Sequence, residues 1–194
     1  MITQATDADF TTVVDVLTEA FQDDPLVGWL FPDAAERAHL QARFYRSQLA
    51  DPCVEAYLID GEAGAALWRT TSSEATPSGD GSEPDLEAAF GPAGARLRAL
   101  GAALAVRHPV APYLYLSCMG VTAGRRGTGL GSALLQHRLD EAGDVTAYLE
   151  ASSPGSRALY LRHGFHDFGA PVQVADGPLL WPMARLPQKK EINR

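Results

Sequence analysis

The sequence is poor in cysteine, with two residues, Cys53 and Cys118, in a chain of 194. They lie far apart in apolar, strand-like stretches, so their spacing fits neither a disulfide framework nor a metal site. A chain of this length can bury a sufficient core without such cross-links. We therefore expect a single domain over residues 1–194 that folds in a reducing compartment and holds no metal.

Targeting and membrane-spanning patterns are missing too. Residues 1–10, MITQATDADF, contain neither the basic stretch nor the apolar stretch of a signal peptide. No apolar run approaches the ~20 residues that a membrane helix requires. These patterns predict a cytoplasmic protein that has no membrane partner.

Positive charge is in short supply. The chain has 16 Lys and Arg residues against 24 Asp and Glu residues, which gives a formal net charge of −8. Nucleic acids require clustered cations, so the sequence argues against a nucleic-acid partner. A negative protein can attract a cationic substrate, although for most acidic proteins the charge serves solubility alone. The local exception is the pair Arg125 and Arg126, which stands among glycines.

Hydrophobic periodicity predicts a mixed α/β domain. Apolar runs that predict strands occupy residues 2–4, 53–59, 63–69, 113–121, 145–149, 166–174 and 179–186. Helical spacing covers residues 10–21, 86–104 (broken at Gly91-Pro92), 130–142 and 157–163, and Asp33 is expected to cap a further helix that runs to residue 50. Residues 70–84 contain no large apolar side chain and predict a mobile loop, and residues 187–194 predict a flexible tail.

The glycine-rich loop TAGRRGTG at residues 122–129 carries the main functional signal. It joins the predicted strand that ends at Val121 to the predicted helix that begins at Leu130. The first turn of a helix offers unpaired N–H groups and a positive dipole end, and glycine lets the backbone come close to an anion. Arg125 and Arg126 could add charge-assisted bonds, so the loop is predicted to bind a phosphate group.

Other phosphate-binding motifs fit this loop less well. A Walker A loop needs Gly-Lys-Ser/Thr where the chain has Gly129 followed by Leu130-Gly131, so that motif is excluded. The dinucleotide pattern G-x-G-x-x-G fits better, with Gly127 and Gly129 in place and Ser132 at the third position, but too few residues follow to complete a doubly wound sheet. A glycine-rich turn without a ligand is the third alternative, and it leaves the paired arginines unexplained.

Two motifs resemble the GNAT superfamily of acetyltransferases. Residues 121–135, VTAGRRGTGLGSALL, are similar to its acetyl-CoA-binding motif Gln/Arg-x-x-Gly-x-Gly/Ala, which Arg126, Gly129 and Gly131 fill. Residues 157–165, RALYLRHGF, resemble its late helix with the Ala…Tyr…Gly-Phe signature. Residues 23–33, DDPLVGWLFPD, are similar to the small-molecule branch that includes puromycin N-acetyltransferase.

The resemblance implies a fold and a set of contacts to acetyl-CoA. The fold would be a mostly antiparallel mixed sheet of about six to seven strands flanked by helices, around a central strand, glycine loop, helix and strand. Backbone groups at the end of the central strand would pair with the pantetheine arm, and the loop N–H groups would hold the pyrophosphate. Ser156 stands where the family often has an asparagine that contacts acetyl-CoA. The expected contacts are Met119, Gly120, Val121, Arg126, Gly127, Thr128, Gly129, Leu130, Gly131, Ser132 and Ser156.

Acetyl transfer to an amine needs a deprotonated amine, a stabilised oxyanion and a proton for the leaving thiolate. In the family the tyrosine that matches Tyr160 points toward the sulfur, so the resemblance implies that Tyr160 is the general acid; packing against Phe165 is the alternative. Glu150 ends a strand where the sheet is expected to splay, and it is the candidate general base. Its alternative roles are an ion pair with Arg157 and a cap of the nearby loop.

Cys118 invites a covalent acetyl-cysteine mechanism. No histidine is obviously placed to activate it, and a strand cysteine is usually a small buried apolar residue, so we expect direct transfer. His108 and His163 are expected at the surface or at helix ends.

The acceptor site is where the sequence says least. Trp29 and Phe31 could line it, and core packing is the alternative for both. With Asp23 or Asp24 nearby, Trp29 would bind an amine through cation–π and charge attraction. The sequence therefore predicts an acetyl-CoA-dependent N-acetyltransferase that acts on a primary amine of a small molecule. Acetylation of a protein N-terminus or lysine and a non-catalytic acyl-CoA-binding protein are the alternatives. A monomer and a homodimer both remain open.

Overall fold

The computed structural model describes residues 1–71, 85–110 and 112–187. Seven strands form one sheet: β1 (Ile2–Gln4), β2 (Val54–Ile59), β3 (Gly64–Thr71), β4 (Tyr113–Val121), β5 (Ala147–Ala151), β6 (His166–Asp167) and β7 (Trp181–Arg185). The α-helices are α1 (Phe10–Ala20), α2 (Pro25–Leu30), α3 (Arg37–Leu49), α4 (Leu86–Phe90), α5 (Ala93–Ala105), α6 (Leu130–Ala142) and α7 (Pro154–Arg162). Short 3₁₀ helices occupy Asp7–Asp9 and Ala123–Arg125.

The strands lie in the order β1-β2-β3-β4-β5-β7-β6. Every neighbouring pair is antiparallel except β4 and β5, which are parallel. Parallel strands need a long crossover, and here it is the glycine loop with α6. The predicted mostly antiparallel mixed sheet and its central strand–loop–helix–strand unit are therefore confirmed.

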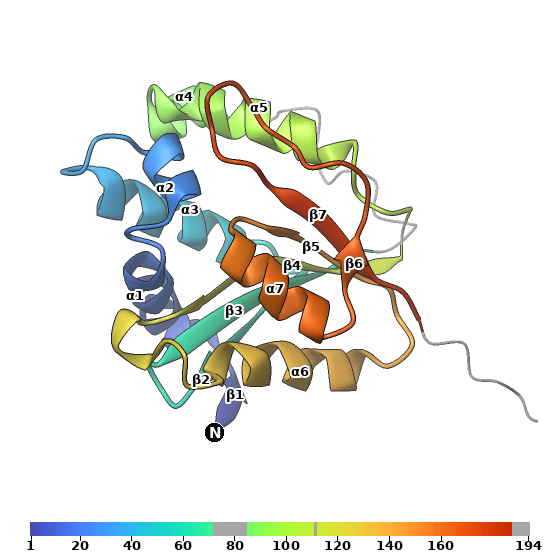
Figure 1. The fold of residues 1–194 in the computed structure, drawn as a ribbon. Coiled ribbons are helices and arrows are strands. Elements are labelled where there is room, and N and C mark those ends of the chain that lie inside the picture. The colour runs from blue at the N-terminus through green and yellow to red at the C-terminus, as the bar shows by residue number, and fades with distance from the viewer. Residues whose placement is uncertain (72–84, 111, 188–194) are drawn as a thin grey trace, which may run out of the picture.

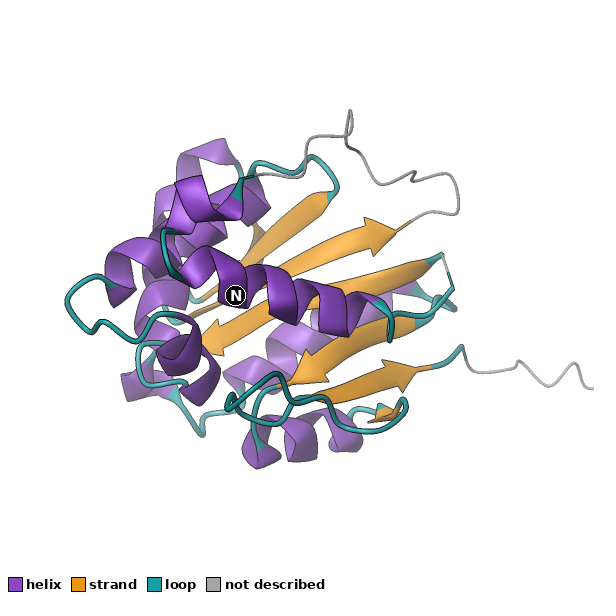
Figure 2. Cartoon of the chain, turned by 90° about the horizontal axis from the view of Figure 1, so that it is seen from above, coloured by secondary structure: helices purple, strands orange, loops and turns teal. Residues whose placement is uncertain are grey.

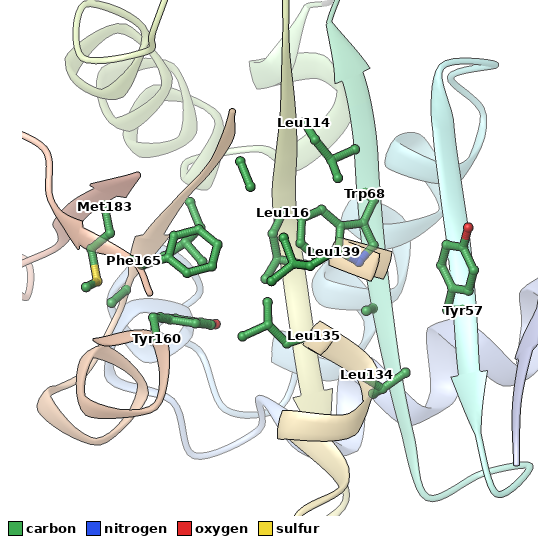
Figure 3. Close-up of a cluster of buried hydrophobic side chains, with 14 of the residues drawn as sticks. Tyr57, Trp68, Leu114, Leu116, Leu134, Leu135, Leu139, Tyr160, Phe165 and Met183 are labelled. Carbon is green, nitrogen blue, oxygen red and sulfur yellow. The ribbon is translucent and has the colours of Figure 1, made fainter. Parts of the chain in front are cut away.

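Helices cover both faces of the sheet (Figures 1 and 2). On one face α6 and α7 pack against β2 to β5 and β7 through a large apolar cluster, whose main members are Trp68, Leu114, Leu116, Leu134, Leu135, Leu139, Leu149, Tyr160, Phe165 and Met183 (Figure 3). On the other face α1 and α3 bury Val13, Val14, Leu17, Tyr45 and Leu49 against β2 and β3. Helices α2, α4 and α5 share a third cluster, which includes Val27, Phe31, Phe90 and Leu100.

The sheet opens between its two parallel strands. β4 and β5 pair only from Leu114 to Leu116 on β4. The next residue, Ser117, is a β-bulge, since Leu116 lies opposite Trp68 and Cys118 lies opposite Leu67 on β3. Among the described strands, none pairs with the β5-facing edge of β4 from Ser117 to Val121. The strands therefore diverge, and the open edge leads toward the glycine loop.

Several element boundaries differ from those predicted. Helix α3 begins at Arg37 because Asp33 forms a separate turn, in which its carboxylate accepts from the N–H of Ala35 (2.9 Å). Helix α7 begins three residues earlier than predicted, at Pro154, because the Ser153 hydroxyl caps it. No helix in the described part of the chain is both long enough and apolar enough to span a membrane.

The strand predictions at residues 145–149, 166–174 and 179–186 also change. β5 lies at Ala147–Ala151, and β7 is shortened to Trp181–Arg185. β6 is only His166–Asp167, and beyond it Val172 forms an isolated bridge with Leu180. Pro171 lacks an N–H for a ladder, which explains why the longer strand does not form. The predicted mobile loop begins inside β3, and its residues 72–84 lie outside the described residues, as do residues 188–194 of the predicted tail.

Candidate active site

The glycine loop presents a row of unpaired backbone donors. The six N–H groups from Gly127 to Ser132 find no hydrogen-bond acceptor among the described residues, and the first that does is Ala133, which donates to the Gly129 carbonyl at 3.0 Å. Gly129 is the N-cap of α6 at φ 86°, a left-handed conformation that glycine adopts without strain. Because these donors surround the positive end of the α6 dipole, they can bind a phosphate group.

Both loop arginines have protein partners. Arg126 donates through Nη2 to the carbonyl of Ala20 at the end of α1 (2.7 Å), and Arg125 pairs with Asp60 (3.2 Å). The N–H of Arg126 donates to Ala123 (3.4 Å), so it is not among the unpaired donors. In this arrangement the two side chains fix the loop against α1 and the β2–β3 turn, and the backbone offers the free donors.

The open edge of β4 contains the predicted pantetheine contacts Met119, Gly120 and Val121. Gly120 is required by its packing, because a Cβ there would lie 2.6 Å from Cβ of Ala20 and 3.0 Å from the ring of Phe21. Met119 packs with the α6–α7 cluster on the opposite side of the strand. The end of α1 thus covers one side of the open edge, and α6 and α7 cover the other.

Tyr160 approaches the gap from the α7 side. Its ring is buried and packs against Phe165, with ring centroids 5.9 Å apart. Figure 3 shows its hydroxyl pointing toward β4. Burial raises the pKa of Tyr160, and the Cys118 thiol raises it further, so the hydroxyl stays protonated at neutral pH. Packing on Phe165 and a hydroxyl available as a proton donor are therefore compatible.

Glu150 approaches the gap from the other face of β5. Leu149 and Ala151 belong to the cluster that contains Tyr160, and alternation along the strand directs Glu150 to the opposite face. Its side chain is only 6% exposed. Oε2 accepts from the Tyr115 hydroxyl (2.8 Å), whereas Oε1 has no hydrogen bond of good geometry. The alternative pairing with Arg157 is absent, because Arg157 binds Asp167 (2.9 Å).

His108 is a candidate site residue that the sequence did not indicate. It follows the end of α5 and is partly exposed, as expected, but its Nε2 lies 3.2 Å from Oε1 of Glu150 and its Nδ1 lies 2.7 Å from the Tyr113 hydroxyl. Its ring packs on Tyr115 and Tyr148 at centroid distances of 4.9 and 4.8 Å. The alternating tyrosines of β4 were the one sequence feature that could have indicated this cluster. They indicate it only when the pairing of β4 with β5 is known. His163, by contrast, ends α7 as expected.

Cys118 lies beside these groups on β4. Burial raises the pKa of its thiol to about 12, and the Asp24 and Glu150 carboxylates contribute in the same direction. A thiol that stays protonated is a poor nucleophile. This agrees with the prediction of direct transfer.

Asp24 is held by α2 and β5. Its Oδ1 caps α2 by accepting from the N–H groups of Leu26 (2.8 Å) and Val27 (3.2 Å), and its Oδ2 accepts from the Ser152 hydroxyl (3.2 Å). Burial raises the pKa of Asp24 despite these hydrogen bonds. The carboxylate therefore ties α2 to the end of β5 near Cys118.

Trp29 does not meet Asp23 or Asp24 in the way that was expected. Its Nε1 donates to Asp176 (2.8 Å), and the guanidinium of Arg96 lies 5.6 Å from its ring centroid. The cation that contacts the ring is thus a residue of α5. Trp29 packs α2 against α5 and the loop before β7.

Ser156 takes part in the cap of α7. Its N–H donates to the Ser153 hydroxyl, and its hydroxyl accepts from the N–H of Ser153, both at 3.1 Å. The hydroxyl therefore has a structural partner, and it lies in the first turn of α7, just after β5.

Comparison with known proteins identifies the family. A family model described as the acetyltransferase (GNAT) family matches residues 67–165, which include β4, the glycine loop, α6, β5 and α7. The chain belongs to the GNAT family. It is accordingly an acetyltransferase.

Solved structures agree with this assignment. The GNAT chain is similar to a Corynebacterium glutamicum protein described as histone acetyltransferase HPA2 and related acetyltransferase, with 31% identity over 99% of this chain and 98% of that chain and a TM-score of 0.75. It shares its fold with arylalkylamine N-acetyltransferase 2 of Aedes aegypti (14% identity, 96% and 98% coverage, TM-score 0.67). It also shares its fold with the ribosomal-protein-S18-alanine N-acetyltransferase of Escherichia coli (17%, 100% and 97%, TM-score 0.59).

Proposed function

We propose that this GNAT protein transfers the acetyl group of acetyl-CoA to a primary amine of a small molecule, by direct attack within a ternary complex. The observation that carries the proposal is the continuous path from the open edge of β4 to the six unpaired N–H groups before α6. Extended ligands bind an open strand edge through their amides, as pantetheine would along Ser117–Val121. The pyrophosphate would then occupy the loop from Gly127 to Ser132.

The positions of Tyr160 and Glu150 suit the two proton transfers. The amine nitrogen attacks the thioester carbonyl carbon, a C–N bond forms, the C–S bond breaks, and the thiolate takes a proton from the Tyr160 hydroxyl. Glu150 takes the proton that the amine loses, and the Tyr160 phenolate regains a proton from water before the next turnover. Because the two residues reach the gap from opposite faces of the sheet, each can serve one substrate without competing with the other.

A cationic small molecule is the acceptor that the charges favour. Asp24 and Glu150 both lie close enough to Cys118 to raise the pKa of its thiol, so negative charge converges beside the gap. The likeness to an arylalkylamine N-acetyltransferase is compatible with such an acceptor. The relative described as a histone acetyltransferase makes protein amines the alternative. Trp29, engaged by Arg96 and Asp176, would shape the site through α2.

The deciding experiment is acetyl-CoA turnover, measured as free thiol release, against arylalkylamines, polyamines, aminonucleosides and peptides. We expect turnover that depends on the amine, with a higher kcat/KM for a small amine than for any peptide. A preference for peptide or protein amines would replace the small-molecule assignment. Acetyl-CoA binding without turnover of any amine would favour a non-catalytic binding protein. A cytoplasmic location stays a prediction, which fractionation of the source cells would test.

A further inference from the structure

A buried base must lose the proton that it gains in each turnover. The Glu150 side chain is 6% exposed, so its carboxylate can pass a proton on only through a neighbouring group. Tyr115 meets that carboxylate at Oε2 and His108 meets it at Oε1. Tyr148 lies close enough for the Glu150 charge to add to the effect of burial in raising its pKa, so Tyr148 keeps its proton. Burial together with the Glu150 charge raises the pKa of Tyr115 well above its usual value, so Tyr115 keeps its proton.

His108 lies between Glu150 and an open pocket. Its side chain is 24% exposed, and it lines a pocket of about 340 Å³ together with Val106, Arg107, Phe168 and Gly169. Val106 and Phe168 are themselves exposed at 79% and 38%, so the pocket communicates with solvent. Imidazole changes its protonation near neutral pH, and both of its nitrogens can carry a proton. His108 therefore has the location and the chemistry of a relay.

The ring of His108 is held in a fixed orientation. Its backbone N–H donates to the Ala105 carbonyl at the end of α5 (3.3 Å), and its Nδ1 meets the Tyr113 hydroxyl. The rings of Tyr115 and Tyr148 flank it. These contacts direct Nε2 toward the Glu150 oxygen that has no well-formed hydrogen bond.

We propose that His108 carries the proton from Glu150 to solvent and so restores the base after each acetyl transfer. This inference rests on the proposed role of Glu150. The proton leaves the amine, binds the Glu150 carboxylate and moves to Nε2 of His108. The imidazolium then releases one proton to water in the pocket, which returns both residues to their starting charge. His108 is a positioning residue, because it acts through Glu150 and does not touch the reacting atoms.

The ionisable groups around His108 determine the charge environment in which it would transfer a proton. Tyr113, Tyr115 and Cys118 face it from β4, Tyr148 faces it from β5, and Arg107 lies in the turn after α5. The tyrosines and the cysteine all have raised pKa values, so they stay neutral around pH 7. These four side chains therefore carry no charge beside the relay at neutral pH.

The test measures kcat and KM for wild type, His108→Gln and His108→Ala at saturating acetyl-CoA and amine. Glutamine keeps a donor beside Glu150 but does not take up and release a proton near neutral pH. We expect both variants to lose about 10-fold or more in kcat, with little change in KM for acetyl-CoA. Added imidazole should restore His108→Ala, because the pocket admits it, while the weakly basic pyrazole should not.

A wild-type kcat in His108→Gln would overturn the relay, and so would equal rescue of His108→Ala by imidazole and pyrazole. Glu150→Gln separates this inference from the proposed function. If Glu150→Gln turns over as fast as wild type, the proposed base fails and the relay fails with it. If Glu150→Gln has a reduced kcat while the His108 variants keep the wild-type kcat, the relay is refuted and the proposed base is not. If His108→Ala does not fold, His108→Gln carries the test through a kcat that rises with buffer concentration, where wild type shows no such rise.

Discussion

Single residues decide whether the transfer passes through a covalent enzyme intermediate. With the pKa of Cys118 raised to about 12, roughly 1 in 10⁴ of the thiol is ionised at pH 8. Iodoacetamide at pH 8 should therefore modify the exposed Cys53 and leave Cys118 intact until the protein is denatured. Mass spectrometry of the digested protein reads the outcome. An acetylated Cys118 recovered during turnover would contradict direct transfer.

Tyr160 allows binding and chemistry to be separated. Tyr160→Phe keeps the ring against Phe165 and removes the proton donor, so kcat should fall by roughly 10²-fold or more while acetyl-CoA affinity changes little. The raised pKa means that wild type should keep its acid throughout the neutral range, so no loss of activity should follow from Tyr160 as pH rises to about 9. Equal rates for the two proteins at saturating substrates would leave Tyr160 a packing residue.

The candidate site residues differ in how much of their surroundings could be predicted from the sequence. Tyr160 came from a local motif, and that motif also supplies its contact with Phe165, whereas its place beside Cys118 of β4 depends on the fold. The position of His108 could not be inferred in the same way, because its contact with Glu150 requires the pairing of Tyr115 with Tyr148 across two strands. Trp29 was linked to Asp24 by sequence proximity, yet its partners come from residues that are distant in the chain.

At the level of elements, phosphate binding by the loop before α6 can be tested by placing a negative charge in the loop. Gly129→Glu places a carboxylate at the unpaired N–H groups, so saturating acetyl-CoA should no longer raise the melting temperature. Gly129→Ala is the matched control, since it shares the positive-φ strain of about 1 kcal/mol without the charge. Its shift should be retained in part. Equal shifts in wild type and Gly129→Glu would place the phosphate elsewhere.

The cap of α2 gives a stability prediction with a defined sign. The pKa of Asp24 is raised in the folded protein, so folding binds a proton, and stability falls as pH rises from about 3.8 through the folded pKa. Asp24→Asn keeps a capping side chain without the charge and should be at least as stable as wild type at pH 7. Asp24→Ala should lose about 1 kcal/mol. Urea unfolding at pH 4 and pH 7 measures both, and the advantage of asparagine should shrink at pH 4.

The elements themselves follow closely from local signals where those signals are strong. Helix α6 has the predicted bounds because Gly129 and Gly143 flank its apolar stripe. The start of α7 was also encoded, by Ser153 as cap and Pro154 in the first turn. The strand after Phe165 was overpredicted, because apolar composition alone does not show that a segment has a partner strand.

For the molecule as a whole, net charge gives a prediction about encounter. A protein with a formal charge of −8 and two carboxylates beside its gap should attract cationic amines from a distance. Salt screens such attraction over about 10 Å at 0.1 M. The kcat/KM for a polyamine should therefore fall several-fold as ionic strength rises, and that for a monoamine should fall less. If kcat/KM depends on salt in the same way for the two amines, electrostatic steering of the acceptor is contradicted.

The divided sheet has a mechanical consequence. Within the sheet, the half that contains β1 to β4 pairs with the half that contains β5 to β7 through three residue pairs of β4 and β5. Beyond these pairs the two described strands diverge and pair no further. A ligand whose amides bound between the diverging strands would link the two halves of the sheet. It would therefore reduce their relative motion, including in strands that the ligand does not contact. Its binding would then slow amide exchange in β7, which no co-substrate atom need touch, as well as along Ser117–Val121. The enzyme would be most pliable between turnovers and most rigid while the acetyl group changes hands.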